Sequence, residues 1–400
     1  MIPSNPKELY SRFVKGHEGK LHFAAHSHHF WPDCTREAQL RYWDDSATLS
    51  DEKWGKIFSE VIPTTQKHIA NILNLKHPEQ IALAPNTHEL SARLLSLFLG
   101  HDKLNILTTS SEFHSWRRQF LRLSEFKQVH VQQVDTSHLL EDRSSFLTEM
   151  KIQLQQSHDL VFLSQVFFDS GLALTDEELL SLVDASPKET IFVIDGYHGF
   201  AALPTNLQAL EGRMFYLGGG YKYAQAGEGV GFMVVPKGLW RPAYTGWFAE
   251  YGTLSQAPGL KVGYSADAMS FMGATQDPSG FYRFNAVWDD FHHRGMSIQE
   301  IHAYVVNLQK LFLKTLDPSF NGNWNLKPLF KPSLDWHGHF LTLEATDLIQ
   351  AERCQQTLSQ NHILIDRRGP RLRIGFGLYQ DQQDVLELCH RLNKLAQGPQ

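Results

Sequence analysis

The sequence predicts an α/β fold built around a mostly parallel sheet. Short, continuous apolar runs of strand length occur at residues 105–109, 160–168, 190–194, 214–217 and 231–235. Helical patterns at 139–156 and 176–183 separate some of these runs, and this alternation is typical of βαβ units whose parallel sheet is covered on both faces. In such sheets ligands bind beyond the carboxyl ends of the strands, so the polar residues that follow each run are candidates for function.

Composition and charge narrow the classes of function. The chain has 400 residues, of which 42% are hydrophobic and 20% charged, and its net charge is −6 with both signs scattered. This is an ordinary globular composition, without the basic surface that nucleic acids or membranes attract. No apolar run reaches the roughly 18 residues that span a bilayer, and charges interrupt the N-terminus where a signal peptide would be apolar. We therefore expect a cytoplasmic protein that acts on small molecules.

The N-terminal half contains one turn with the features of an anion site. Residues 20–31 begin as a short strand and become a polar, His-rich turn, and residues 54–75 have helical spacing. A short buried strand at 81–85 is followed by the polar turn 86–89 and a helix at 90–99. Strand, polar turn and helix in this order place backbone N–H groups at a helix N-terminus, where phosphate binds. The alternative is a plain Asn or Thr N-cap.

The C-terminal part has a different pattern. A long helical stretch at 284–313 precedes a connection rich in Pro and Asn, strand-like runs near 337–345, 362–368 and 370–379, and helices at 351–360 and 382–395. We predict a second, smaller α+β domain. The expected organisation is an N-terminal segment, 1–50, that contributes to the small domain and the pocket, a large domain, 51–281, and a small domain, 282–400.

Lys222 is the residue with the clearest chemical signal. It stands between two tyrosines, after an apolar run that ends in three glycines. A lysine at the mouth of a strand, surrounded by small residues, can attach an aldehyde cofactor. Asp195 follows the run 190–194, where a carboxylate would keep a ring nitrogen protonated, and His198 lies three residues on. A lysine, an acid and a phosphate cradle are what pyridoxal 5′-phosphate requires, although a lysine after a strand is more often a solvated loop residue.

The motifs around these residues resemble a known family. The set Asp195-x-x-His198, followed by Gly220-Tyr221-Lys222-Tyr223 and Ala226-Gly227-x-Gly229, resembles the class V, fold type I pyridoxal phosphate enzymes, and kynureninases in particular. The resemblance spans residues 20–385. It implies a large domain with a mostly parallel sheet, a smaller α+β C-terminal domain, and catalytic roles for Lys222, Asp195 and His198.

The resemblance also implies roles for residues elsewhere in the chain. Matching motifs appear in the family's order. For three of the matched residues the sequence leaves a structural alternative: Phe113 or Trp247 could be a core residue, and Arg373 could form a structural salt bridge with Asp366 or Asp384. The implied cofactor contacts are Thr87, His88, Phe113, Ser164, Asp195, His198, Tyr221, Lys222, Trp247 and Thr275, the last reached from the partner subunit, and the implied substrate contacts are Arg373, His26, Ser27 and His28. A homodimer with shared active sites follows from the role of Thr275.

Three segments depart from the kynureninase pattern. The turn Asn-Ser-Leu-Gly is replaced by His-Ser-His-His at 26–29, the segment 49–54 lacks the family's histidine, and 113–116 reads Phe-His-Ser-Trp without the acid of Phe-Pro-x-Asp. The histidines of 26–29 are compatible with metal binding, but pocket lining or surface is favoured and no metal is expected. The cofactor site is therefore kept while the substrate pocket is altered.

The leading hypothesis is an enzyme that acts on the α-amino group of an amino acid by kynureninase-like hydrolytic or eliminative cleavage. Transamination by a class V aminotransferase is the first alternative. A reaction like that of cysteine desulfurases or selenocysteine lyases is the second, disfavoured because Cys354 lies in a helical context rather than a late loop. A non-catalytic, cofactor-binding regulator is the third, and the joint presence of Lys222, Asp195 and Arg373 speaks against it.

Overall fold

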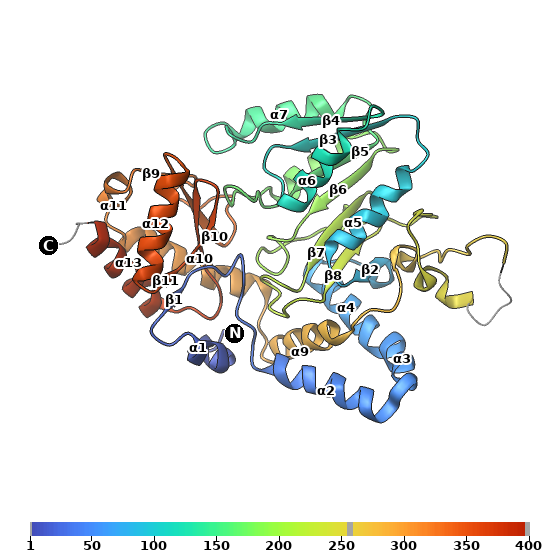
Figure 1. Ribbon diagram of the computed structural model, residues 1–400, viewed down its shortest axis with the longest axis horizontal. Helices are drawn as coiled ribbons and strands as arrows, with labels where there is room; N and C mark the ends of the chain where they lie inside the picture. Colours follow the sequence, from blue (N-terminus) through green and yellow to red (C-terminus); the bar gives the residue numbers. More distant parts are fainter. Residues whose placement is uncertain (1, 254–258, 397–400) are drawn as a thin grey trace.

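A seven-stranded sheet forms the centre of the computed structural model, which describes residues 2–253 and 259–396 (Figure 1). The strand order is β2-β8-β7-β6-β5-β3-β4. β8 runs antiparallel to both β7 and β2, and the other paired strands run parallel, which confirms the predicted mostly parallel sheet. The strands are β2 (Ile81–Ala84), β3 (Leu104–Thr109), β4 (Val129–Val134), β5 (Leu160–Ser164), β6 (Ile191–Asp195), β7 (Met214–Gly219) and β8 (Gly231–Val234).

The continuous apolar runs became the central strands because both faces of this sheet are covered. Every residue of β5 and β7 is buried, as the uninterrupted apolar sequence requires. The carboxyl ends of β2, β3, β5, β6 and β7 meet at one edge of the sheet. Four helices follow strands of this sheet, namely α5 (Thr87–Leu95), α6 (His114–Leu123), α7 (Arg143–Leu154) and α8 (Asp176–Ala185). Of these, α7 and α8 lie within or near their predicted ranges, and α5 begins at Thr87, inside the predicted polar turn.

Two elements of this layer were not predicted. β4 is an edge strand in which only Val134 is buried, so it lacks the continuous apolar run of its neighbours. α6 carries three arginines and buries only Trp116 and Phe120, so its apolar face is narrow. In both cases the element is fixed by tertiary packing more than by its own sequence pattern.

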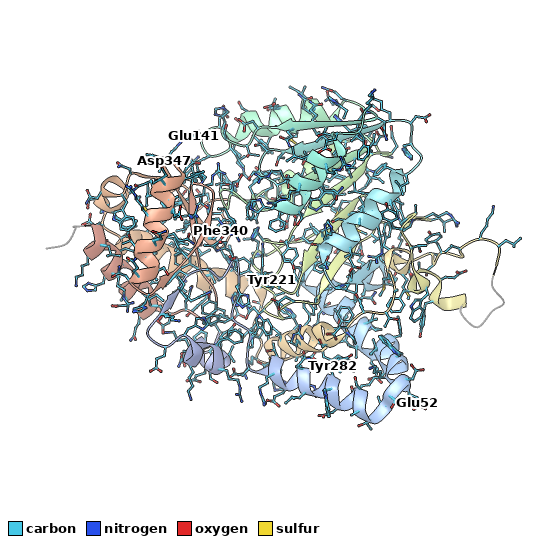
Figure 2. The ribbon with its side chains drawn as sticks, in the orientation of Figure 1. Glu52, Glu141, Tyr221, Tyr282, Phe340 and Asp347 are labelled. Atoms are coloured by element: carbon cyan, nitrogen blue, oxygen red, sulfur yellow. The ribbon has the colours of Figure 1, made fainter. Side chains whose placement is uncertain are left out.

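The predicted helix at 54–75 is interrupted. It consists of α3 (Lys53–Lys56), a π-helical turn (Ile57–Val61) and α4 (Ile62–Leu73). Pro63 stands in the first turn of α4, where its missing N–H removes a hydrogen bond and favours the wider turn before it. The unpredicted helix α2 (Cys34–Leu49) packs along α9 (Ser279–His293), and the Tyr282 hydroxyl of α9 donates to Asp45 Oδ2 of α2 at 2.8 Å (Figure 2).

The predicted helix at 284–313 is also two helices, α9 and α10 (Ile298–Thr315). The break lies at Gly295, whose φ of 64° is left-handed, and Ser297 with Glu300 forms a capping box that starts α10.

A second, four-stranded sheet follows in the order β12-β13-β10-β9, and its paired strands are antiparallel. It is built from β9 (Leu326–Pro328), β10 (Phe340–Ala345), β12 (Asp366–Arg368) and β13 (Arg371–Gly375), with α11 (Ser319–Asn323), α12 (Leu348–Gln360) and α13 (Gln382–Ala396). The N-terminal segment, which also forms α1 (Ser11–Gly16), joins this part because β1 (Leu21–His22) pairs with β11 (Ile363–Leu364). The predicted α+β character is confirmed, and the domain boundaries at 50/51 and 281/282 stay predictions.

Across the described residues, none of the helices is both long enough and apolar enough to cross a membrane.

A buried arginine of α9 fixes the loop that follows Lys222. Arg283 donates from Nε to the carbonyl oxygen of Ala226 at 2.9 Å, and it also donates to the carbonyl oxygen of Glu228. Gly227 between them has a φ of 72°, and a Cβ there would lie 2.3 Å from the Trp31 ring. The loop therefore depends on one cation and one glycine.

We expect Arg283→Met to lower the free energy of unfolding by about 2–4 kcal/mol, because buried carbonyl groups lose their donor. Arg36→Met is the matched control, since Arg36 is an exposed residue whose partner is its neighbour Glu37 and whose loss should cost under about 0.5 kcal/mol. Urea denaturation of the two variants measures the difference, and equal losses would contradict the structural role of Arg283.

Candidate active site

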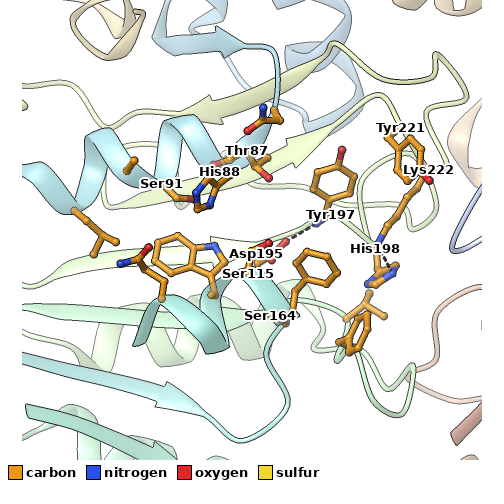
Figure 3. A pocket seen from close by; sticks show the side chains of 18 residues that line it. Thr87, His88, Ser91, Ser115, Ser164, Asp195, Tyr197, His198, Tyr221 and Lys222 are labelled. Atoms are coloured by element: carbon orange, nitrogen blue, oxygen red, sulfur yellow. Dashed lines mark hydrogen bonds between the residues drawn. The ribbon is translucent and has the colours of Figure 1, made fainter. Parts of the chain in front are cut away.

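A cavity of about 240 Å³ opens at the edge where the strand ends meet (Figure 3). Of the predicted cofactor contacts, all except Trp247 and Thr275 line it. The lining side chains come from the strand ends and from α5 and α6, and they are Asn86, Thr87, His88, Ser91, Ala92, Leu95, Phe113, Ser115, Trp116, Gln119, Ser164, Val166, Phe168, Asp195, Tyr197, His198, Tyr221 and Lys222.

Lys222 reaches this cavity from the turn that follows β7. Its Nζ lies 2.6 Å from His198 Nε2, 5.2 Å from the ring centre of Tyr197 and 5.5 Å from that of Phe113 (Figure 3). Burial, with the positive charge of Arg373, lowers the pKa of Lys222 to about 7, against the opposing effect of the Asp195 charge. The amine is therefore substantially neutral near neutral pH, which is its nucleophilic form.

Asp195 ends β6 and faces the same cavity. Its Oδ1 accepts a hydrogen bond from the backbone N–H of Tyr197 at 2.9 Å (Figure 3). Burial raises the pKa of Asp195, and the hydrogen bond from Tyr197 and the charge of Lys222 oppose this. No described side chain forms an ion pair with Asp195. A buried carboxylate without a paired cation is suited to a ligand that brings a protonated nitrogen.

The start of α5 borders the cavity at its other end. The Asn86 side chain accepts from the backbone N–H of Glu89 at 3.1 Å, so the N-cap expected from the sequence is present. Gly231 of β8 lets this turn come close, since a Cβ there would lie 2.4 Å from the Asn86 carbonyl carbon and 2.7 Å from the Thr87 nitrogen. A helix N-terminus carries a partial positive charge and suits a phosphate.

These residues fit pyridoxal 5′-phosphate by the chemistry of the donor set. The buried amine of Lys222 suits the aldehyde, the uncompensated Asp195 suits the ring nitrogen, and the start of α5 suits the phosphate. Phe113, His198 and Tyr197 supply the walls between them.

Two further residues of the site were not assigned from the sequence. Glu112, after β3, accepts from Ser164 Oγ at 2.6 Å and from Thr109 Oγ1 at 2.6 Å, and it therefore holds Ser164 in place. Burial raises the pKa of Glu112 to about 8 against these hydrogen bonds, with a further contribution from the Asp195 charge. Tyr197 lies next to the Lys222 amine. The sequence does place Glu112 just after a predicted strand, which makes it a candidate for the site. Its burial and its hydrogen-bond partners cannot be predicted from the sequence.

Trp247 and Thr275 lie outside this cavity. Trp247 packs against Phe58 and Phe248, and Thr275 is exposed. Their segments are neighbours, because the backbone N–H of Phe248 donates to the carbonyl oxygen of Gly273 at 3.1 Å. Their contact with a phosphate in a neighbouring subunit stays a prediction.

Arg373 is buried behind the cavity wall. Its guanidinium pairs with Asp366, with Nε at 2.9 Å from Oδ2, and Nη1 donates to the carbonyl oxygen of Phe168 at 2.9 Å. Its Cζ lies 4.2 Å from the ring centre of Phe168, which does line the cavity. Arg373 therefore forms the salt bridge to Asp366 that was the structural alternative in the sequence analysis. Its role in substrate binding stays a prediction.

The predicted histidine-rich turn lies beside this ion pair rather than in the cavity lining. His26 is fully buried, stacks on Phe340 with ring centres 4.6 Å apart, and places Nε2 at 3.5 Å from Asp366 Oδ2. Figure 2 shows Phe340 at the side of the small sheet that faces the large one. Burial, with the Arg373 charge, lowers the pKa of His26 to about 3, so its ring is neutral. Ser27 is half-buried, and His28 Nδ1 lies 3.4 Å from the Tyr221 hydroxyl.

Among the described residues, no group of three or more His, Cys, Asp or Glu side chains is arranged to hold a metal ion.

A mostly parallel sheet with a buried lysine and a buried aspartate at its strand ends defines the fold type I class of pyridoxal phosphate enzymes. The chain belongs to the class-V aminotransferase family, because residues 32–388 match the family described as Aminotransferase class-V. Family membership confirms the predicted cofactor, pyridoxal 5′-phosphate. It supports the broad family and not the finer resemblance to kynureninases.

Solved structures of similar fold include an apo cysteine desulfurase from Thermococcus onnurineus NA1, with 16% identity, coverage of 99% of both chains and a TM-score of 0.81. Another is the cystine C-S lyase C-DES in complex with its product cysteine persulfide, with 18% identity, coverage of 95% of this chain and 99% of that one, and a TM-score of 0.79. At these identities the likeness shows the fold alone. Histidinol-phosphate aminotransferase 2 of Legionella pneumophila (strain Paris) is 27% identical over 144 residues, which are 36% of this chain and 37% of that protein, so little more than a third of that relative is matched.

As pH rises from 5 to 9, we expect the free energy of unfolding of the wild type to fall relative to that of the Glu112→Gln variant. The carboxyl of Glu112 titrates near 4.5 when unfolded and near 8 when folded, so the folded state binds more protons in that window and wild-type stability falls as pH rises. The amide cannot ionise and lacks this trend. Chemical denaturation at each pH measures the difference, with exposed Glu141→Gln as the control. A pH-independent difference would contradict the raised pKa.

Proposed function

We propose that the protein is a pyridoxal phosphate enzyme that acts on the α-amino group of an amino acid and cleaves a bond of its side chain, by elimination or hydrolysis. The observation that carries this proposal is the buried amine of Lys222, which lies in one cavity with the unpaired carboxylate of Asp195. A lysine of this kind serves covalent and proton-transfer chemistry, and family membership supplies the cofactor.

The side chains around Lys222 are arranged for proton transfer. When bound, pyridoxal phosphate supplies an electron sink for the bonds of the substrate's α-carbon. Lys222 Nζ, with a pKa near 7, takes and returns the α-proton, and His198 Nε2 at 2.6 Å holds that amine in place and exchanges a proton with it. Asp195, which lines the same cavity, supplies the carboxylate that would pair with a protonated ring nitrogen.

The positions of the cysteines favour the proposed cleavage over a desulfuration in which an enzyme cysteine would carry a persulfide. Burial raises the thiol pKa of Cys34 and Cys389 to about 12 and that of Cys354 to about 11. All three cysteines are described, and they lie on α2, α12 and α13 rather than in the cavity lining. A sulfur-accepting cysteine must be a thiolate that reaches the substrate. Cleavage therefore ranks first, transamination second and desulfuration third.

We also propose a homodimer in which Thr275 reaches the neighbouring site. The exposure of Thr275, next to the segment of Trp247 and outside its own subunit's cavity, supports this arrangement.

Purified wild-type protein should be yellow, and Lys222→Ala should lose the chromophore that borohydride fixes to the chain, because the proposed point of covalent attachment is removed. Lys237→Ala is the matched control, since Lys237 is exposed and contacts His77. Absorbance spectra and peptide mass spectrometry after reduction measure the outcome. A colourless wild type that takes up no added cofactor would sink the proposal.

Replacing Cys34, Cys354 and Cys389 one at a time by Ala should leave most of the activity in place, because none of the thiols reaches the cavity. The assay screens amino acids and detects pyruvate, alanine, ammonia or sulfide. Loss of activity in one variant that stays folded would instead favour a persulfide mechanism.

A further inference from the structure

Three arginines lie on one face of the small sheet. Asp366 is paired across the strands with Arg373, and Arg368 with Arg371, so these four side chains project from the same face. Arg373 donates to the carbonyl oxygen of Phe168, so this face is turned to the loop that follows β5 and forms part of the cavity wall.

The three arginines differ in how fully they are paired. Arg371 has two carboxylates, Asp169 at 3.0 Å and Glu344 at 3.1 Å. Arg373 and Arg368 share the single carboxylate of Asp366, and Arg373 with its two-pronged contact holds the larger part of it. The three arginines are thus matched in number by the carboxylates of Asp169, Glu344 and Asp366, and Arg368 has the smallest share of a carboxylate.

Arg368 is the member of this set with unused binding capacity. Its Nη1 lies 3.0 Å from Asp366 Oδ1 and 3.1 Å from the carbonyl oxygen of Arg367. Its Nε is buried and has no hydrogen-bond partner among the described residues, while the side chain as a whole is 41% exposed. The exposed part of this guanidinium, which shares its carboxylate with Arg373, can donate hydrogen bonds to an anion.

Arg368 lies near the mouth of the cavity. Burial is the largest cause of the pKa shifts of Lys222, Tyr221 and His114, and the charge of Arg368 adds a lowering effect to each of the three. His114 in turn packs against Phe168 with ring centres 4.9 Å apart. Arg371, which is paired across the strands with Arg368, contacts Asp169 at 3.0 Å, next to Phe168 of the cavity lining. Arg368 therefore lies on the side of the small sheet that faces this cavity wall.

The start of α6, beside His114, is also basic. The range of α6 holds Arg117 and Arg118 and no acidic residue. Arg117 contacts His114 Nδ1 at 3.2 Å and Arg118 donates to the carbonyl oxygen of His114 at 3.4 Å, and neither has a carboxylate partner in the described part of the chain. Burial is the largest cause of the lowered pKa of His114, the charges of Arg117, Arg118 and Arg368 lower it further, and only the Asp169 carboxylate opposes them among the main causes. Positive charge therefore gathers on this side of the cavity, where it attracts an anion.

We propose that Arg368 binds a negatively charged group on the substrate's side chain, so that the enzyme acts on amino acids with an anionic side chain such as a carboxylate or sulfinate. This rests on the proposed function, and it makes Arg368 a residue that determines specificity.

The experiment titrates the holoenzyme with matched ligands and follows the cofactor absorbance. The charged ligands are L-aspartate, L-glutamate and L-cysteine sulfinate, and the neutral ones are L-asparagine, L-glutamine and L-cysteine. At least one charged ligand should bind about tenfold or more tightly than its neutral counterpart, as a charge-assisted hydrogen bond predicts. Arg368→Gln should abolish this preference and Arg368→Lys should retain part of it.

Arg367→Gln is the matched control. Arg367 stands on the same strand, but its Nε donates to Gln355 at 2.8 Å on the side of α12, so the preference should be unchanged. A wild type that binds charged and neutral ligands equally would overturn the inference. The inference would also be overturned if Arg368→Gln weakened the binding of charged and neutral ligands by the same factor. That result would mean that Arg368 binds the carboxylate common to all amino acids. If no amino acid changes the cofactor absorbance, the proposed function falls as well.

Discussion

The contact between the buried Lys222 amine and the buried ring of His198 is the interaction on which the site depends. A buried ammonium without a full counterion is costly, and the protein meets this by keeping the amine largely neutral rather than by placing a carboxylate against it. Glycines make the geometry available. A Cβ at Gly219 would lie 2.6 Å from the Tyr197 hydroxyl, so this glycine allows Tyr197 to pack beside the lysine. The central position of β7, buried along its whole length, then fixes where the amine points.

Charge in the site is divided between two networks that meet at Phe168. The large sheet supplies acids, because burial raises the pKa values of Asp195 and Glu112, and the Asp195 charge raises that of Glu112 further. The small sheet supplies cations, because Arg373 is held by Asp366 and packs on Phe168 from behind. The pKa of Asp366 stays well below its usual value although burial opposes this, since His26 and Arg373 both stabilise the carboxylate. The acids of the site therefore lie on the large sheet and its arginines on the small one.

The sequence could predict the parts of the fold that a single local pattern determines. Uninterrupted apolar runs located the central strands, and the residues after them, Lys222 and Asp195 among them, do line one cavity. β4 and α6 could not be found in the same way, because one is a half-exposed edge strand and the other buries only two side chains. The hydrogen bonds of Glu112 depend on Ser164, 52 residues away, and the pairing of Arg373 depends on the register of β12 against β13. Long-range contacts of this kind have no signature in local sequence.

Two of the segments that depart from the kynureninase pattern lie next to the small sheet or in α6. The segment 26–29 departs from that pattern, and its His26 lies against Asp366 and Phe340, on the side of the arginines. Gly375 accommodates it, since a Cβ there would lie 2.1 Å from His26 Nδ1. The segment 113–116 also departs, and it contributes His114 to the basic mouth and Trp116 to the cavity wall. Lys222, Asp195 and the start of α5 lie outside both segments. A family that keeps its cofactor residues on the large sheet can therefore change substrate through residues of the small sheet and of α6, and this chain differs from kynureninases at those positions.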